Sequence, residues 1–134
     1  MTLLELCYYK RDLILENSVS TLEKGQMKNY KKLYTESNRF KMLNLFQMLV
    51  NSIETNSSNE MKECIGKLSA LRFEPGYGLH EVQTAMNILE ECMWENINKF
   101  VDEDLQISGI KQVTRLLGKA KEQLADEYSL SKNN

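Results

Sequence analysis

The sequence predicts an all-α protein, a bundle of five or six helices for which a globin-like arrangement is one of the possible forms. Three observations support this class. Apolar residues recur at spacings of three and four, and strict alternation is rare. One proline and six glycines in 134 residues leave few helix breakers. Hydrophobic residues make up 42% and charged residues 27%, as in an ordinary globular domain. We therefore expect one domain over residues 1–130 and a disordered tail over 131–134.

The first half of the chain predicts three helical stretches. A helix over about 2–23 is expected to end at Gly25, and its inner side would carry Leu3, Leu6, Tyr9, Leu13 and Ile14. A short turn or helix follows over 26–34. A long helix over about 36–54 has an apolar stripe of Met42, Leu45, Phe46, Leu49, Val50 and Ile53.

The second half predicts three more helices. Ser57 and Glu60 have the spacing of a capping box, which would begin a helix over about 58–73. The strongest pattern covers 79–101, so this helix is expected to be central; its stripe is Leu79, Val82, Met86, Leu89, Met93, Ile97 and Phe100. The last helix, over about 104–129, contains two glycines that weaken it locally, Gly109 and Gly118.

Composition indicates in which cellular compartment the protein is expected. The three cysteines lie far apart with no C-x-x-C motif, which favours a reducing compartment. No apolar run is long enough to span a membrane, and no signal peptide is evident. A net charge of −2 argues against a dedicated nucleic-acid binder. We expect a cytoplasmic protein that binds neither membranes nor nucleic acids.

The segment "RFEPGYGLHEV", residues 72–82, is predicted to be a structural corner between two helices. Pro75 would end the preceding helix, and Gly76 and Gly78 can take positive φ angles. Gly78 is an acceptable N-cap, and Glu81 then falls at the third helical position, where its charge favours the helix dipole.

The run "LRFEPGYGLHEVQTAMNILEECMWENI" resembles the signature stretch of the N-terminal domain of RsbT co-antagonist (RsbR-type) proteins. Those domains tend to have a glycine, an aromatic residue, a capping residue and x-x-E-V, then an apolar helix that ends near a tryptophan. The matching positions here are Gly76, Tyr77, Glu81, Val82, Leu89 and Trp94. Gly78 departs from the serine or proline that is common in the family. Glu90-Glu91 stands where Leu-Arg is common, so no role of that arginine carries over.

The resemblance implies a non-enzymatic sensory or regulatory domain in signal transduction. RsbR-type domains act in stress-response regulation upstream of a STAS module in the stressosome, and related input domains occur on histidine kinases. Some are globin-like homodimers that bind no haem. A homodimer and a downstream signalling protein are therefore the expected partners, and no cofactor is expected.

No catalytic or metal-binding constellation is predicted, because the chain lacks Glu-x-x-His pairs and the phosphate-binding and nucleophile motifs. His80, the only histidine, is expected to be an exposed or capping residue, with a haem ligand as the alternative. The central helix offers a candidate pocket at Met86, Leu89 and Met93, although core filling is the commoner role of methionine. A haem, small-ligand or redox-binding sensor is the alternative function.

Charge and apolar patterning suggest surfaces for association. Residues 23–41 hold six basic and two acidic residues, whereas residues 81–104 hold seven acidic and one basic. Opposed charge of this kind could steer a partner or be complementary within one chain. The last helix supplies the candidate dimer seam, which comprises Ile110, Val113, Leu117 and Leu124.

Overall fold

The computed structural model describes the chain except residues 26–32, 73–78 and 133–134. For residues 25, 33–38, 67–72, 79–81 and 130–132 it describes the backbone only. The described residues form six α-helices, one 3₁₀ turn and no strand, which confirms the all-α helical bundle. In chain order these are α1 (Leu3–Tyr9), α2 (Arg11–Gly25), α3 (Leu33–Thr55), α4 (Asn59–Arg72), α5 (Leu79–Phe100), η1 (Glu103–Leu105) and α6 (Gln106–Lys132).

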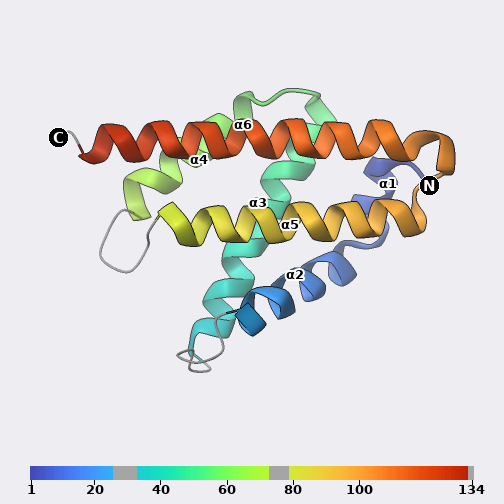
Figure 1. The fold of residues 1–134 in the computed structure, drawn as a ribbon, viewed down its shortest axis with the longest axis horizontal. Coiled ribbons are helices and arrows are strands. Elements are labelled where there is room, and N and C mark those ends of the chain that lie inside the picture. The colour runs from blue at the N-terminus through green and yellow to red at the C-terminus, as the bar shows by residue number, and fades with distance from the viewer. Residues whose placement is uncertain (26–32, 73–78, 133–134) are drawn as a thin grey trace.

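Two long antiparallel helices, α5 and α6, lie side by side along the longest dimension of the molecule (Figure 1). The α3 helix crosses behind both of them, and α2 packs against α5 and α3. The α4 helix packs against α3 and α6. The short α1 lies at the end of the molecule where η1 joins α5 to α6, so the N-terminus is next to that corner.

The described residues form one hydrophobic cluster, which receives side chains from all six α-helices. The α5 helix is central to it, as its spacing predicts, because Met86, Leu89, Met93 and Ile97 have no exposed surface. Burying side chains of this size contributes about 1.5–3 kcal/mol each relative to exposing them. Packing of these faces, more than local helix propensity, therefore holds the bundle together.

The first predicted helix is interrupted, which corrects the expectation of one helix over 2–23. Lys10 separates α1 from α2 with φ −113° and ψ 20°. The bend changes which face of the chain is inside, so Tyr9 and Leu13, expected on the inner side, are 74% and 39% exposed. The α2 helix instead buries Leu15 next to Ile14. No proline or glycine stands at the bend, so tertiary packing imposes it.

The turn between α3 and α4 is a Schellman motif. Asn56 has φ 50°, the Ser57 amide donates to the Ser52 carbonyl at 3.2 Å, and the Asn56 amide donates to the Ile53 carbonyl at 3.3 Å. The predicted capping box is shifted here, because the Ser57 hydroxyl accepts from the amide of Asn59, at 3.2 Å, rather than from that of Glu60. Left-handed Asn56 thus ends α3 and sets where α4 begins.

Other boundaries differ modestly from the predictions. Leu33 and Tyr34 belong to α3, and the rest of the stretch predicted over 26–34 lies outside the described residues. The α6 helix continues to Lys132, so the tail predicted for 131–134 is helical in its first two residues.

Among the described residues, three polar side chains are buried in the core, those of Ser18, Ser52 and Asn96. Each donates to the carbonyl four residues earlier in its own helix, at 2.7, 2.9 and 2.7 Å respectively. Each buried donor is therefore satisfied within its own helix. Along the described chain, no helix combines the length and apolar character needed to cross a bilayer.

Candidate functional site

The predicted corner between α4 and α5 cannot be placed, because Pro75, Gly76 and Gly78 lie outside the described residues. His80 and Glu81 belong to the first turn of α5, but their side chains are also outside the described part. The structural corner, and the alternative of a haem ligand at His80, therefore stay predictions.

The three side chains assigned to a candidate pocket lie inside the packed core. Met86, Leu89 and Met93 have no exposed surface and belong to the single hydrophobic cluster. Their helix is surrounded by α1, α2, α3 and α6. They are thus core-filling residues, the commoner role of methionine at such spacing.

The residues of the predicted dimer seam are covered within one chain. Val113 and Leu117 have no exposed surface, Leu124 is 2% exposed, and Ile110 is partly buried against the core. The α3, α4 and α5 helices of the same chain cover this stripe. An apolar stripe shows that a helix face is buried, but it does not show which chain buries it.

Polar contacts join α6 to its neighbours along the α5 side. The Trp94 indole Nε1 donates to the Thr114 hydroxyl at 3.1 Å. Further along, Lys121 Nζ lies 3.5 Å from Glu90 Oε2, with side-chain exposures of 26% and 12%. Glu90 is therefore largely covered as well as paired. The two contacts are about two helical turns apart along α6 and about one turn apart along α5.

A third contact ties α6 to the opposite side of the bundle. Arg115 Nη2 donates to Asn56 Oδ1 at 3.3 Å, in the turn between α3 and α4. The left-handed backbone that ends α3 therefore also places a hydrogen-bond acceptor in front of α6. Contacts from α5 and from the α3–α4 turn meet within one short stretch of α6, at Thr114 and Arg115.

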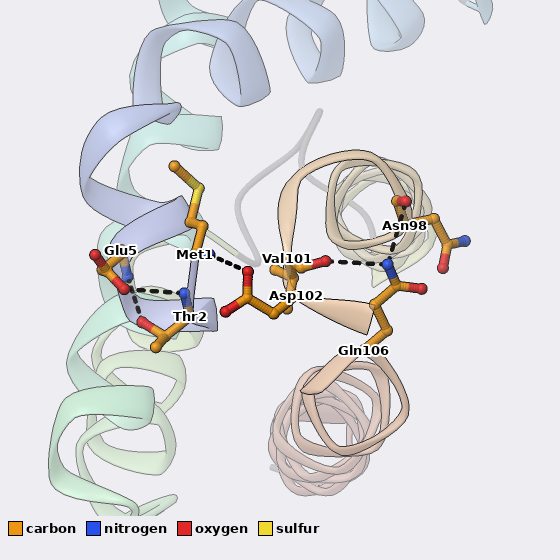
Figure 2. Close-up of polar contacts among 7 residues, drawn as sticks. All are labelled: Met1, Thr2, Glu5, Asn98, Val101, Asp102 and Gln106. Carbon is orange, nitrogen blue, oxygen red and sulfur yellow. Dashed lines mark hydrogen bonds and ion pairs between the residues drawn. The ribbon is translucent and has the colours of Figure 1, made fainter. Parts of the chain in front are cut away.

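The N-terminal residue closes the corner between α5 and α6 (Figure 2). The Met1 ammonium pairs with the Asp102 carboxylate, and the Asp102 amide donates to the Met1 carbonyl at 2.9 Å. Gln106 Nε2 donates to the carbonyl of Val101 at 3.0 Å and to that of Asn98 at 3.4 Å. Since the last carbonyls of a helix lack internal partners, Gln106 satisfies the end of α5.

A capping box begins α1. The Glu5 amide donates to Thr2 Oγ1 at 3.2 Å, and the Thr2 amide donates to Glu5 Oε1 at 3.0 Å. The spacing Thr-x-x-Glu is a capping-box signal in the sequence, like the one at Ser57, but no capping box was predicted here. The hydrogen bonds from Thr2 lower the pKa of the Glu5 carboxyl, and the hydrogen bond to Asp102 raises the pKa of the Met1 ammonium.

The three thiols have different surroundings. Burial raises the pKa of Cys7 to about 12, with a further contribution from the charge of Glu54. Burial also raises the pKa of Cys92, although the Ser18 hydroxyl opposes the shift. Cys64 is exposed. Because the thiolate is the reactive form, the two buried thiols are poorly suited to redox chemistry.

Within the described ranges, no group of three or more His, Cys, Asp or Glu residues is placed to hold a metal ion. Comparison of the chain with protein-family models, curated proteins and solved structures finds no match. The α6 helix packs against three helices and makes polar contacts with α5 and with the α3–α4 turn.

Proposed function

We propose that this chain is a non-enzymatic, cytoplasmic sensory or regulatory domain of the RsbR-type kind. It works as a homodimer and transmits a change in helix packing through α6 to a downstream signalling protein. The resemblance of residues 71–97 to the RsbR-type signature supports the class, and the fold is compatible with it.

The observation that carries the proposal is the position of α6. This helix contacts α3, α4 and α5, and the pairs Trp94–Thr114 and Lys121–Glu90 join it to α5. A displacement of any of the three neighbours changes the packing under α6. Since cores are close-packed, such a displacement passes to α6 rather than into empty space. A rigid helix of 27 residues then carries it to its far end.

A chimera tests this function. The chain replaces the N-terminal domain of an RsbR-type protein, with α6 joined in helical phase to the STAS module, and a stress-response reporter is measured. Inserting one to four alanines after Lys132 rotates the output module by about 100° per residue. We expect reporter output to rise and fall with the number of alanines.

The matched control inserts one to four glycines at the same place, which interrupts the helix and should abolish the phase dependence. Output identical to that of the STAS module alone, for every insertion, would refute the proposal.

A further inference from the structure

The junction between α1 and α2 retains part of the hydrogen bonding of a continuous helix. The Lys10 amide donates to the Leu6 carbonyl at 2.9 Å, and the Ile14 amide donates to the Lys10 carbonyl at 3.0 Å. Within residues 3–25, the amides of Arg11, Asp12 and Leu13 make no such bond to the carbonyls four residues earlier. Straightening the chain at Lys10 would form these three bonds.

The sequence at the junction permits a straight helix. Residues 9–11 read Tyr-Lys-Arg and contain no helix breaker, and the apolar spacing predicts one helix over 2–23. The bend is held from outside by the packing of α1 against α3 and α5, and at the same place Lys10 Nζ lies 4.6 Å from the centre of the Phe100 ring. Two backbone arrangements of the same segment are thus available, one bent and one straight.

The α1 helix depends on the surface that it covers. It has seven residues, whereas isolated helices shorter than about 12 residues are marginal in water. Leu3, Leu6 and Cys7 are buried against α3 and α5, and Met1 pairs with Asp102. Every one of these contacts could be made equally well by the α1 helix of a second copy, because the two surfaces are identical in sequence.

Exposed apolar side chains gather at the same junction. Tyr8 is 58% exposed, Tyr9 74% and Leu13 39%, so half of the six large exposed hydrophobic residues in the described chain lie within three positions of Lys10. When two copies exchange a terminal element, their connecting segments run past each other and form a new contact. That contact would cover these side chains.

We propose that two copies of this chain form a dimer by exchanging α1, with Lys10 as the hinge. In the exchanged form residues 3–25 are one straight helix, and its first seven residues fill the α1 site on the partner. This inference rests on the proposed function only for the existence of a homodimer, and it assigns the surface that holds the dimer.

A cysteine pair reports which chain supplies α1. A Cβ atom on Gly109 would lie 4.0 Å from Leu3 Cβ, within the range of disulfide-bonded residues, about 3.5–4.5 Å. The variant is Leu3→Cys with Gly109→Cys, in a Cys64→Ser background that removes the exposed thiol. The matched controls are the two single cysteine variants in the same background.

The dimer fraction is first measured by sedimentation, and the protein is then oxidised at the same concentration. On a non-reducing gel we expect the double variant to become a covalent dimer in proportion to that fraction, and reductant should reverse this. The single variants should stay monomeric on the gel. A double variant that cross-links only within one chain overturns the exchange, and so does a protein that sediments as a monomer at every concentration.

A pair of hinge variants tests the same idea with native cysteines. Lys10→Ala and Lys10→Gly both remove the contact with Phe100, but glycine disfavours the straight helix by about fivefold per hinge. With two hinges in a dimer, the dissociation constant of Lys10→Gly should exceed that of Lys10→Ala by roughly 25-fold. Equal constants overturn the exchange. A dimer that persists with equal constants leaves the proposed function standing and places its interface elsewhere.

Discussion

Replacing Leu117 with alanine tests whether this residue lies in the core of one chain or in a contact between two chains. Leu117 has no exposed surface, and its side chain lies in the cluster formed by all six α-helices. Truncating a fully buried leucine removes its transfer free energy and leaves a cavity, together about 3 kcal/mol. A domain of this size has a total stability of about 5–15 kcal/mol, so the variant should fold but be clearly weakened.

The assay is urea unfolding followed by circular dichroism at two protein concentrations that differ widely. With a slope of about 1.5 kcal/mol per molar urea, the midpoint should fall by about 2 M. The difference between the variant and the native chain should be the same at both concentrations, because helices of one chain bury Leu117. Lys119→Ala, an exposed position two residues along α6, is the matched control and should change stability by less than about 0.5 kcal/mol.

A different result would refute this reasoning. If Leu117→Ala cost less than about 1 kcal/mol, the side chain would not be buried as the structure has it. If the loss appeared only at high protein concentration, the seam first expected from the apolar stripe would be correct and the intrachain packing of α6 would be wrong.

Three further predictions concern Gly118, the three thiols and the pair of Met1 with Asp102. Gly118→Ala should stabilise the protein by about 0.5–1 kcal/mol, seen as a higher melting temperature, because nothing lies within 4 Å of the added Cβ; a lower melting temperature would contradict this. At pH 8, Ellman's reagent should label Cys64 quickly and leave Cys7, with its pKa of about 12, unlabelled until the protein unfolds; fast labelling of all three thiols would contradict the burial. Asp102→Asn should lower the pKa of the Met1 ammonium toward its ordinary value of 8.0, as measured by NMR titration. Folding raises this pKa in the native chain, so the pair stabilises the folded state below pH 8.0, and this stabilisation is lost as pH rises through the folded-state pKa. An unchanged pKa of the Met1 ammonium in this variant would show that Met1 and Asp102 do not pair.

Much of the fold follows from amphipathic spacing, because a stripe of apolar residues has to be buried somewhere. The spacing of Met86, Leu89, Met93 and Ile97 predicted a central helix, and the structure buries all four. The break at Lys10 could not be predicted in this way. Local residues there favour a helix, and only the packing of α1 against α3 and α5 decides against it.

The contacts around α6 were less predictable from sequence. Met1 and Asp102 are 101 positions apart, and no local pattern pairs them. Trp94 and Thr114 likewise meet only because α5 and α6 are antiparallel. The capping box at Thr2 is the exception, because its two partners are three residues apart and the motif is visible in the sequence.

The buried polar side chains of the core have a consequence for how its helices can move. Each of these side chains donates a hydrogen bond to a carbonyl of its own helix; they are Ser18, Ser52 and Asn96. Those bonds survive intact when one helix slips lengthwise or rolls against another, whereas a bond across the interface would have to break first. The relative register of these helices then depends mainly on the fit of apolar side chains, and the hydrogen bond between Ser18 and the Cys92 thiol is a polar contact across α2 and α5 that sliding would break.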